Sequence, residues 1–235
     1  MQRIKQLFNR RARLVRNLAI ASAITIFAVG TAMATLKMRL SDGTTTVDIV
    51  DNGVGDLSPG ITGLITASVS FPNYLVDVQV GSTKPVLGNS LQPEMDLGST
   101  VIPSGTAIPS LTIDVSDTGY LGAGTVFLKA SNTQTALGSV TFKAWADPAN
   151  VDFGTGGIAG SIGPVGSGTF LSTAGVISTV PFSLHERVIF SPTGAGGVFS
   201  TDFDTKVSPE GSSLAMLLPG LAPLGLILRR RMKKA

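Results

Sequence analysis

The chain has 235 residues, no cysteine and a formal net charge of +3. The absence of cysteine excludes a disulfide-stapled scaffold and a thiol nucleophile. Basic residues gather at the two ends, so the segment between Thr35 and Glu210 carries seven basic and fifteen acidic residues, a formal charge of −8. Such a segment repels nucleic acid and anionic lipid surfaces, which excludes a nucleic-acid-binding protein.

Residues 1–34 have the pattern of a signal peptide. A basic stretch precedes an apolar run over residues 18–29, and Ala32-Met33-Ala34 supplies small residues where signal peptidase requires them. We predict an N-terminal signal helix that follows the general secretion route and is cleaved after Ala34. An uncleaved anchor helix is the alternative.

Residues 35–207 predict one all-β domain. Runs rich in Val, Ile, Thr and Phe alternate with turn-forming residues, and no stretch carries a helical period. The expected strands are 45–50, 61–69, 75–80, 111–115, 125–130, 139–145, 176–187 and 198–207. We expect a single β-sandwich of roughly eight to ten strands, with either a jelly-roll or an immunoglobulin-like topology.

One stretch interrupts this series. Residues 154–168 contain seven glycines, and glycine loses much backbone freedom when a strand orders it. We therefore expect a mobile surface loop. A phosphate-binding loop is not indicated, because the stretch has no basic residue and no helix is expected after it.

Three aromatic residues are candidates for stacking against sugar rings: Tyr74, Tyr120 and Trp145. Trp145 lies in the strand predicted at 139–145, where a lone tryptophan more often packs than binds. A carbohydrate-binding module would need at least two of these rings on one face.

No catalytic set is recognisable, so we predict that the protein is not an enzyme. The single histidine, His185, lies in a predicted strand without the second histidine of a zinc helix, and we expect it to face solvent. Glycoside hydrolysis needs two facing carboxylates. Nothing in the sequence brings Glu94 and Glu186 together.

Calcium is the most plausible metal. Asp48, Asp51 and Asp56 lie in a glycine-rich stretch whose oxygen ligands suit Ca²⁺. The spacing is not that of a helix-loop-helix site, however, and Asp-Gly turns need no metal. Calcium is therefore a hypothesis, and no cofactor is expected.

Residues 208–235 combine a Pro-Glu turn, an apolar span and a basic tail. The span 214–228 has no charge, and as a helix it would reach about 22 Å of a hydrocarbon core about 30 Å thick. Arg229, Arg230 and Arg231 would stay in the cytoplasm. We predict a C-terminal transmembrane helix that leaves the β-domain on the opposite side of the membrane.

This tail resembles the PEP-CTERM sorting signal, which membrane proteases called exosortases process in Gram-negative bacteria that make extracellular polymer. Pro209 and Glu210, the Ser212-Ser213-Leu214 entry into the span and the arginine cluster carry the resemblance, although Gly211 replaces the second proline of the family motif. The resemblance implies export, brief tethering to the membrane and processing by an exosortase.

These patterns favour a non-enzymatic protein of the cell surface or extracellular matrix that is associated with exopolysaccharide in a biofilm. Its expected partners are signal peptidase, an exosortase, the membrane before processing and an extracellular polysaccharide. A secreted carbohydrate-binding module is the first alternative. A secreted hydrolase is the second, and it would need carboxylates clustered in a cleft.

Overall fold

The computed structural model describes residues 35–105 and 108–208. Every regular element in this part of the chain is a β-strand, which confirms the predicted all-β class. None of it forms a helix that is long and apolar enough to span a membrane. The predicted cleavage site at Ala32 and Ala34, the sorting residues Pro209, Glu210 and Arg229–Arg231, and the span 214–228 lie outside the described residues.

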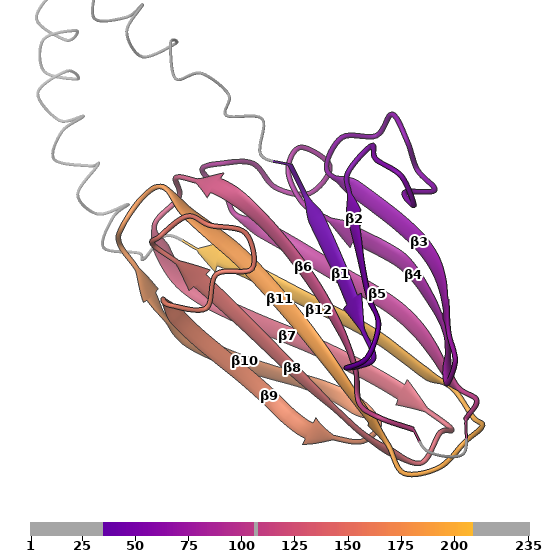
Figure 1. The fold of residues 1–235 in the computed structure, drawn as a ribbon. Coiled ribbons are helices and arrows are strands. Elements are labelled where there is room, and N and C mark those ends of the chain that lie inside the picture. Colours follow the sequence, from indigo (N-terminus) through magenta and orange to yellow (C-terminus); the bar gives the residue numbers. More distant parts are fainter. Residues whose placement is uncertain (1–34, 106–107, 209–235) are drawn as a thin grey trace, which may run out of the picture. The chain divides into compact units, whose positions relative to one another are not determined.

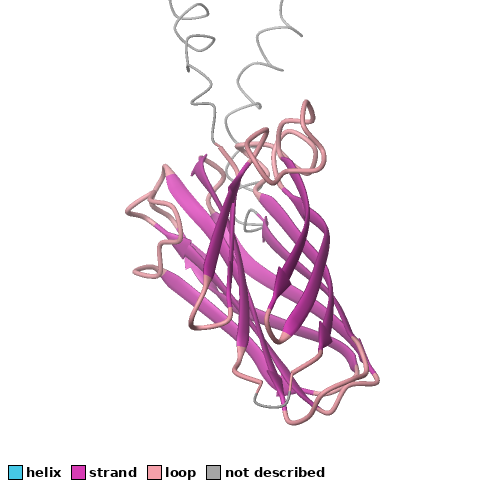
Figure 2. Ribbon diagram, turned by 45° about the vertical axis from the view of Figure 1, so that its right-hand side comes forward, coloured by secondary structure: helices cyan, strands magenta, loops and turns pink. Residues whose placement is uncertain are grey.

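Twelve strands form two six-stranded sheets that pack face to face (Figures 1 and 2). Sheet A has the order β2 (Thr46–Val50), β1 (Lys37–Ser41), β6 (Leu111–Tyr120), β11 (Phe182–Pro192), β8 (Gly138–Asp147) and β9 (Ile158–Val165). Sheet B has the order β10 (Gly168–Ile177), β7 (Gly124–Gln134), β12 (Phe199–Ser208), β5 (Glu94–Pro103), β4 (Tyr74–Ser82) and β3 (Leu64–Phe71). All neighbouring strands are antiparallel.

The strand order decides between the two topologies that the sequence left open. Strands β5, β12, β7 and β10 are neighbours in sheet B, and β6, β11, β8 and β9 are neighbours in sheet A. This is the order of a jelly roll, in which the chain passes repeatedly between the sheets. The hairpins β1–β2 and β3–β4 extend one sheet each.

The core lies between the sheets and follows from strict alternation along the strands. In β12, for example, every second residue from Phe199 to Val207 is buried, while Ser200, Asp202, Asp204 and Lys206 face outward. Aromatic rings meet across the core, with Phe142 and Phe203 5.2 Å apart between centroids. Each fully buried apolar side chain of this size contributes about 1.5–3 kcal/mol.

The glycine-rich stretch is not the surface loop that the sequence predicted. Most of it forms edge strand β9, and its last residue, Gly168, begins β10. A Cβ atom at Gly160 would lie 2.8 Å from Leu128 Cδ1 and 2.9 Å from Ala174 Cβ. Glycine is used here because β9 approaches β7 and β10 too closely for a side chain. A further difference is that residues 178–181 form a turn inside the strand predicted at 176–187.

Both ends of the described chain lie at one end of the sandwich, which we call the terminal end. Because successive strands run in opposite directions, Thr35, Ser208 and every second loop meet there. These loops are 51–63, 83–93, 121–123, 148–157 and 178–181. The remaining loops lie at the opposite end, which we call the far end.

Candidate functional site

Two of the three predicted stacking residues are closed to a ligand. Tyr74 is 1% exposed and Tyr120 is 0% exposed, so neither ring can stack against a sugar. The Tyr74 hydroxyl donates to the carbonyl of Pro109, and the Tyr120 hydroxyl contacts Thr83 and Asp117. Both tyrosines are core residues whose polar tips are satisfied. Trp145 alone remains partly exposed.

The predicted calcium ligands do not come together. Asp48 is paired with Arg39 through two bonds of 2.7 and 3.0 Å. Asp51 accepts from the N–H of Gly63 at 2.7 Å. Asp56 accepts three N–H groups, those of Asn52, Ser58 and Thr66. Asp51 and Asp56 instead hold the backbone of the loop 51–63, as Asp commonly does in turns.

Trp145 stands on the outer face of sheet A with one face of its ring supported. It lies between His185 on β11 and Ala159 on β9 in the strand register. The indole stacks on the imidazole with centroids 4.7 Å apart and planes 22° apart. The register partner of Trp145 on the other side is Ala159, a small and exposed residue of the edge strand β9.

His185 is buried rather than solvent-facing as the sequence predicted. Strand alternation does turn it outward, but loop 148–157 folds over it, and it is 1% exposed. The Phe153 ring meets the imidazole edge-on at 5.7 Å. The Phe153 N–H donates to Ser116 Oγ at 2.9 Å, which ties the loop to β6.

Asp114 holds His185 and Arg187, the two residues of β11 that lie next to the indole. One of its oxygens, Oδ1, lies 2.7 Å from His185 Nε2 and accepts from Arg187 Nε at 2.6 Å. The other ring nitrogen of His185, Nδ1, lies 3.3 Å from the carbonyl oxygen of Gly154. The imidazole is therefore held on both sides, and it keeps the indole in one orientation.

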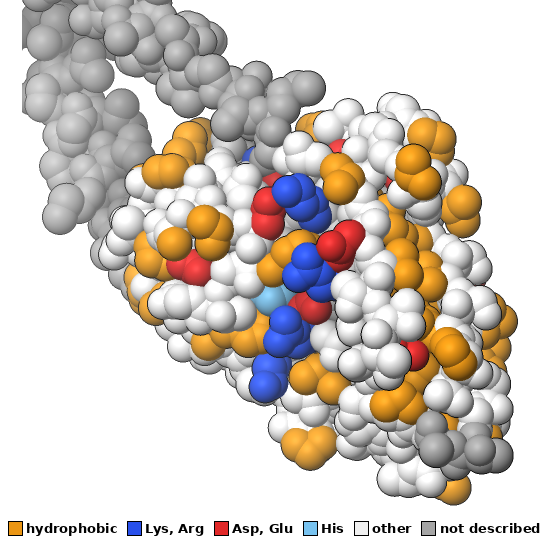
Figure 3. Space-filling view, viewed as in Figure 1, with side chains coloured by type: hydrophobic (Ala, Val, Ile, Leu, Met, Phe, Trp, Pro, Cys, Tyr) orange, Lys and Arg blue, Asp and Glu red, His pale blue; other side chains and the backbone are white. Residues whose placement is uncertain are grey.

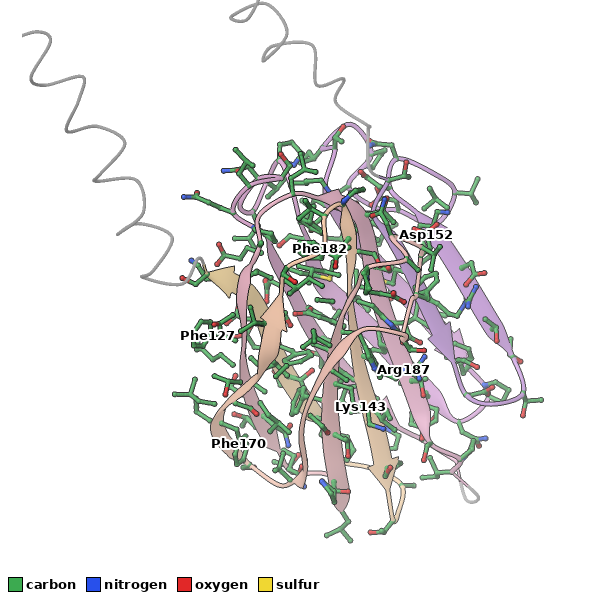
Figure 4. The ribbon with its side chains drawn as sticks, turned by 90° about the vertical axis from the view of Figure 1, so that its left-hand side faces the viewer. Phe127, Lys143, Asp152, Phe170, Phe182 and Arg187 are labelled. Atoms are coloured by element: carbon green, nitrogen blue, oxygen red, sulfur yellow. The ribbon has the colours of Figure 1, made fainter. Side chains whose placement is uncertain are left out.

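Charged residues form a row across sheet A. In register across β2, β1, β6, β11 and β8 lie Asp48, Arg39, Asp114, Arg187 and Lys143. Figure 3 shows basic and acidic side chains gathered on this face beside the histidine, and Figure 4 labels Lys143 and Arg187.

The row ends with two cations side by side. Lys143 forms no ion pair within the described part of the chain, whereas Arg187 pairs with Asp114. The Arg187 guanidinium also lies 5.5 Å from the Trp145 ring centroid. Like charges directly opposite in a sheet are destabilising, so this edge of the face favours an anion. We call Lys143, Trp145, His185, Arg187 and Asp114 the tryptophan site.

A second candidate lies on the outer face of sheet B. A groove of about 800 Å³ is lined by Glu94, Phe127, Leu128, Lys129, Leu171, Ser172, Thr173, Asp204 and Lys206. We call it the acid groove. Phe127 is exposed in it, and Lys129 pairs with Asp204 at 3.0 Å.

Three carboxylates meet at one side of the acid groove. Asp96, Asp202 and Asp204 each place an oxygen within 4.8 Å of the others, and they are the one such group within residues 35–105 and 108–208 that could hold a metal ion. Burial, together with the charges of Asp202 and Asp204, raises the pKa of Asp96 to about 7. Asp202 and Asp204 are outward residues of β12 by alternation, but nothing in the sequence indicates that β5 lies beside this strand.

No protein-family model matches the chain, and no characterised protein matches it in sequence. Among solved structures it is similar to the enzymatically active domain of bacteriophage CBA120 tailspike protein 4, with 12% identity and a TM-score of 0.35 over 65% of this chain and 20% of that chain. It is also similar to TmCBM61, solved with β-1,4-galactotriose, with 12% identity and a TM-score of 0.31 over 59% of this chain and 91% of that one. The mannan-recognising module TmCBM27 has 13% identity and a TM-score of 0.30 over 62% and 98%. Function therefore has to be argued from the chain's own residues.

Proposed function

We propose that this chain is an exported, non-catalytic protein that binds an acidic polysaccharide through the tryptophan site. The observation that carries the proposal is the partly exposed Trp145 ring, which is stacked on His185 and has the small, exposed Ala159 as its other register neighbour.

The geometry suits a sugar chain for two reasons. A flat aromatic ring with a fixed orientation offers a large apolar surface and loses little conformational entropy on binding. Lys143 and Arg187 lie next to the ring and can donate to hydroxyl and carboxylate oxygens of a uronic acid. An anionic ligand also reduces the repulsion between the Lys143 and Arg187 side chains.

The sequence patterns at the two ends supply the location in this proposal. Signal peptidase removes residues 1–34, the span 214–228 holds the tail in the membrane, and an exosortase then processes the chain near Glu210. The domain thereby reaches the cell surface or the extracellular matrix of a Gram-negative bacterium, where polysaccharide is available.

Replacement of Trp145 tests the proposal. We expect Trp145→Ala to weaken binding of the full chain to alginate by about tenfold, because an aromatic contact contributes about 1.5 kcal/mol. Trp145→Phe should keep much of the affinity, since it keeps a ring. Affinity electrophoresis or calorimetry with alginate and with neutral mannan measures the change.

Phe127→Ala is the matched control, because Phe127 is an exposed aromatic residue on the opposite sheet. Lys143→Ala should reduce binding to alginate more than binding to mannan. Equal affinity of wild type and Trp145→Ala, with unchanged circular dichroism, would remove the tryptophan site from the proposal.

The acid groove favours a second candidate function, glycoside hydrolysis. A carboxyl group with a pKa near 7 can act as a general acid while a neighbouring carboxylate stays ionised. Asp96 has this property and lies beside Asp202 and Asp204.

This alternative predicts that the full chain releases reducing ends from a polysaccharide and that Asp96→Asn abolishes the release. Binding to alginate should be unaffected by this change, because Asp96 lies on the opposite sheet from Trp145. If wild type releases no reducing ends from a broad panel of acidic and neutral polysaccharides, the chain is a binding protein alone.

A further inference from the structure

We propose that the terminal end of the sandwich contacts the outer surface of the lipid bilayer through apolar loop tips while the C-terminal segment is attached. This inference rests on one part of the proposed function, the insertion of the span 214–228 in the membrane. It assigns a lipid-binding role to loops that the polysaccharide site does not use.

Exposed apolar side chains are concentrated at the terminal end. Seven of the thirteen exposed large hydrophobic residues of the described chain lie in its loops: Val54, Leu57, Ile61, Val86, Leu91, Val151 and Val180. Val54 is 98% exposed and Leu57 is 66% exposed, so these side chains contribute nothing to the core. The loops of the far end hold one such residue, Leu137.

The charged side chains of the same loops are either buried and hydrogen-bonded or held in ion pairs. Asp51 and Asp56 are buried and accept backbone N–H groups. Lys84 pairs with Asp117 at 2.8 Å, and Asp152 pairs with Lys37 at 2.6 Å.

No other Asp, Glu, Lys or Arg occurs in these five loops. Their tips can therefore enter a lipid interface without removing an unpaired charge from water, a step that is costly in free energy.

The path of the chain brings this end close to the membrane. Ser208 ends β12 at the terminal end, and the uncharged span begins at Leu214, six residues later. Six residues can extend over about 20 Å at most. A span inserted in the bilayer therefore keeps the loop tips within reach of the headgroup region, where exposed apolar side chains bind weakly.

Lipid fits this surface better than a protein partner does. The apolar residues sit on separate loop tips, whereas protein interfaces use a contiguous patch. Figure 3 shows hydrophobic side chains at this end as separate spots among other residues. The tips also carry no free basic residue to attract anionic headgroups, so the inferred contact is with zwitterionic lipid. The tail supplies the local concentration that such a weak contact needs.

The absence of cysteine allows a direct test. Val54→Cys, Leu57→Cys and Leu91→Cys each introduce one cysteine at the terminal end, and Leu137→Cys introduces the matched control at the far end. Each full-length variant is labelled with an environment-sensitive fluorophore and reconstituted in phosphatidylcholine vesicles with and without spin-labelled lipid.

We expect blue-shifted emission at the terminal end and at least about twofold more quenching than at Leu137, because interfacial side chains enter the headgroup boundary by about 5–10 Å. Sedimentation with the vesicles shows separately whether the chain is attached to the membrane. A chain that sediments but shows equal, weak quenching at all four positions overturns this inference and leaves the inserted tail intact.

Two further outcomes count against the inference. A chain that does not sediment with vesicles overturns both the inference and the membrane step of the proposed function. A blue shift that appears without vesicles indicates that a second copy of the chain covers the loops, and it overturns the lipid assignment.

Discussion

Glu186 occupies an unfavourable environment for a carboxylate. It lies on β11 between two outward residues, His185 and Arg187, so alternation turns it into the core. It is 0% exposed, and neither of its oxygens has a hydrogen-bond partner among residues 35–105 and 108–208. Burial raises the pKa of the Glu186 carboxyl well above its ordinary value, so the folded protein holds this group in its neutral form.

This burial predicts that the protein becomes less stable as the pH rises. The unfolded chain releases the Glu186 proton near pH 4.5, whereas the folded protein keeps it until its raised pKa is reached. The free energy of unfolding therefore falls above pH 4.5, by at most about 1.4 kcal/mol per pH unit for one proton. Urea unfolding between pH 5 and 8 measures the slope, and Glu186→Gln should make it shallower.

Asp96→Asn is the control for this measurement. The pKa of Asp96 is raised to about 7, so this residue contributes a slope of the same sign that ends near pH 7. The effects of Glu186→Gln and Asp96→Asn should not be fully additive, because the charge of Asp96 is one of the causes that raise the pKa of Glu186. An identical slope in wild type and Glu186→Gln would show that Glu186 is ionised in the folded state.

At the scale of the element, β9 shows how glycine can be a packing residue. This strand forms one edge of sheet A and pairs with β8 alone in that sheet. A side chain at position 160 would point toward Leu128 and Ala174 of the opposite sheet. The two sheets approach closely at this edge, and the strand also positions Ala159 beside Trp145.

A side chain at Gly160 should separate the sheets. We expect Gly160→Val to lower the free energy of unfolding by about 1–3 kcal/mol, the usual cost of overpacking. Gly166→Ala is the control, because a Cβ there meets no atom of the described part of the chain within 4 Å. Thermal unfolding followed by circular dichroism compares the two variants. Equal melting temperatures for the two variants would show that β9 has room for a side chain at position 160.

At the scale of the whole molecule, the jelly roll separates three surfaces. The tryptophan site lies on the outer face of sheet A, the acid groove on the outer face of sheet B, and the apolar loops at the terminal end. Strands run between the terminal end and the far end (Figure 1). A membrane at the terminal end would therefore leave both sheet faces open to polysaccharide.

The all-β class, the sandwich and most of the strand positions could be predicted from the amino-acid sequence. These follow from local alternation of apolar and polar residues, which one strand displays without its neighbours. The same alternation accounts for the position of Asp202 and Asp204 on one face of β12. The signal peptide and the sorting tail also stay predictions from local sequence.

The topology and the candidate sites became visible only in the folded chain. His185 is an outward strand residue by alternation, yet a loop from another part of the chain covers it. The site around it joins Asp114, Trp145 and His185 from three strands, and the acid cluster joins Asp96 to residues more than a hundred positions away. Which outward residues become neighbours depends on strand order. That order is set by long-range packing, because a jelly roll pairs strands that are distant along the chain.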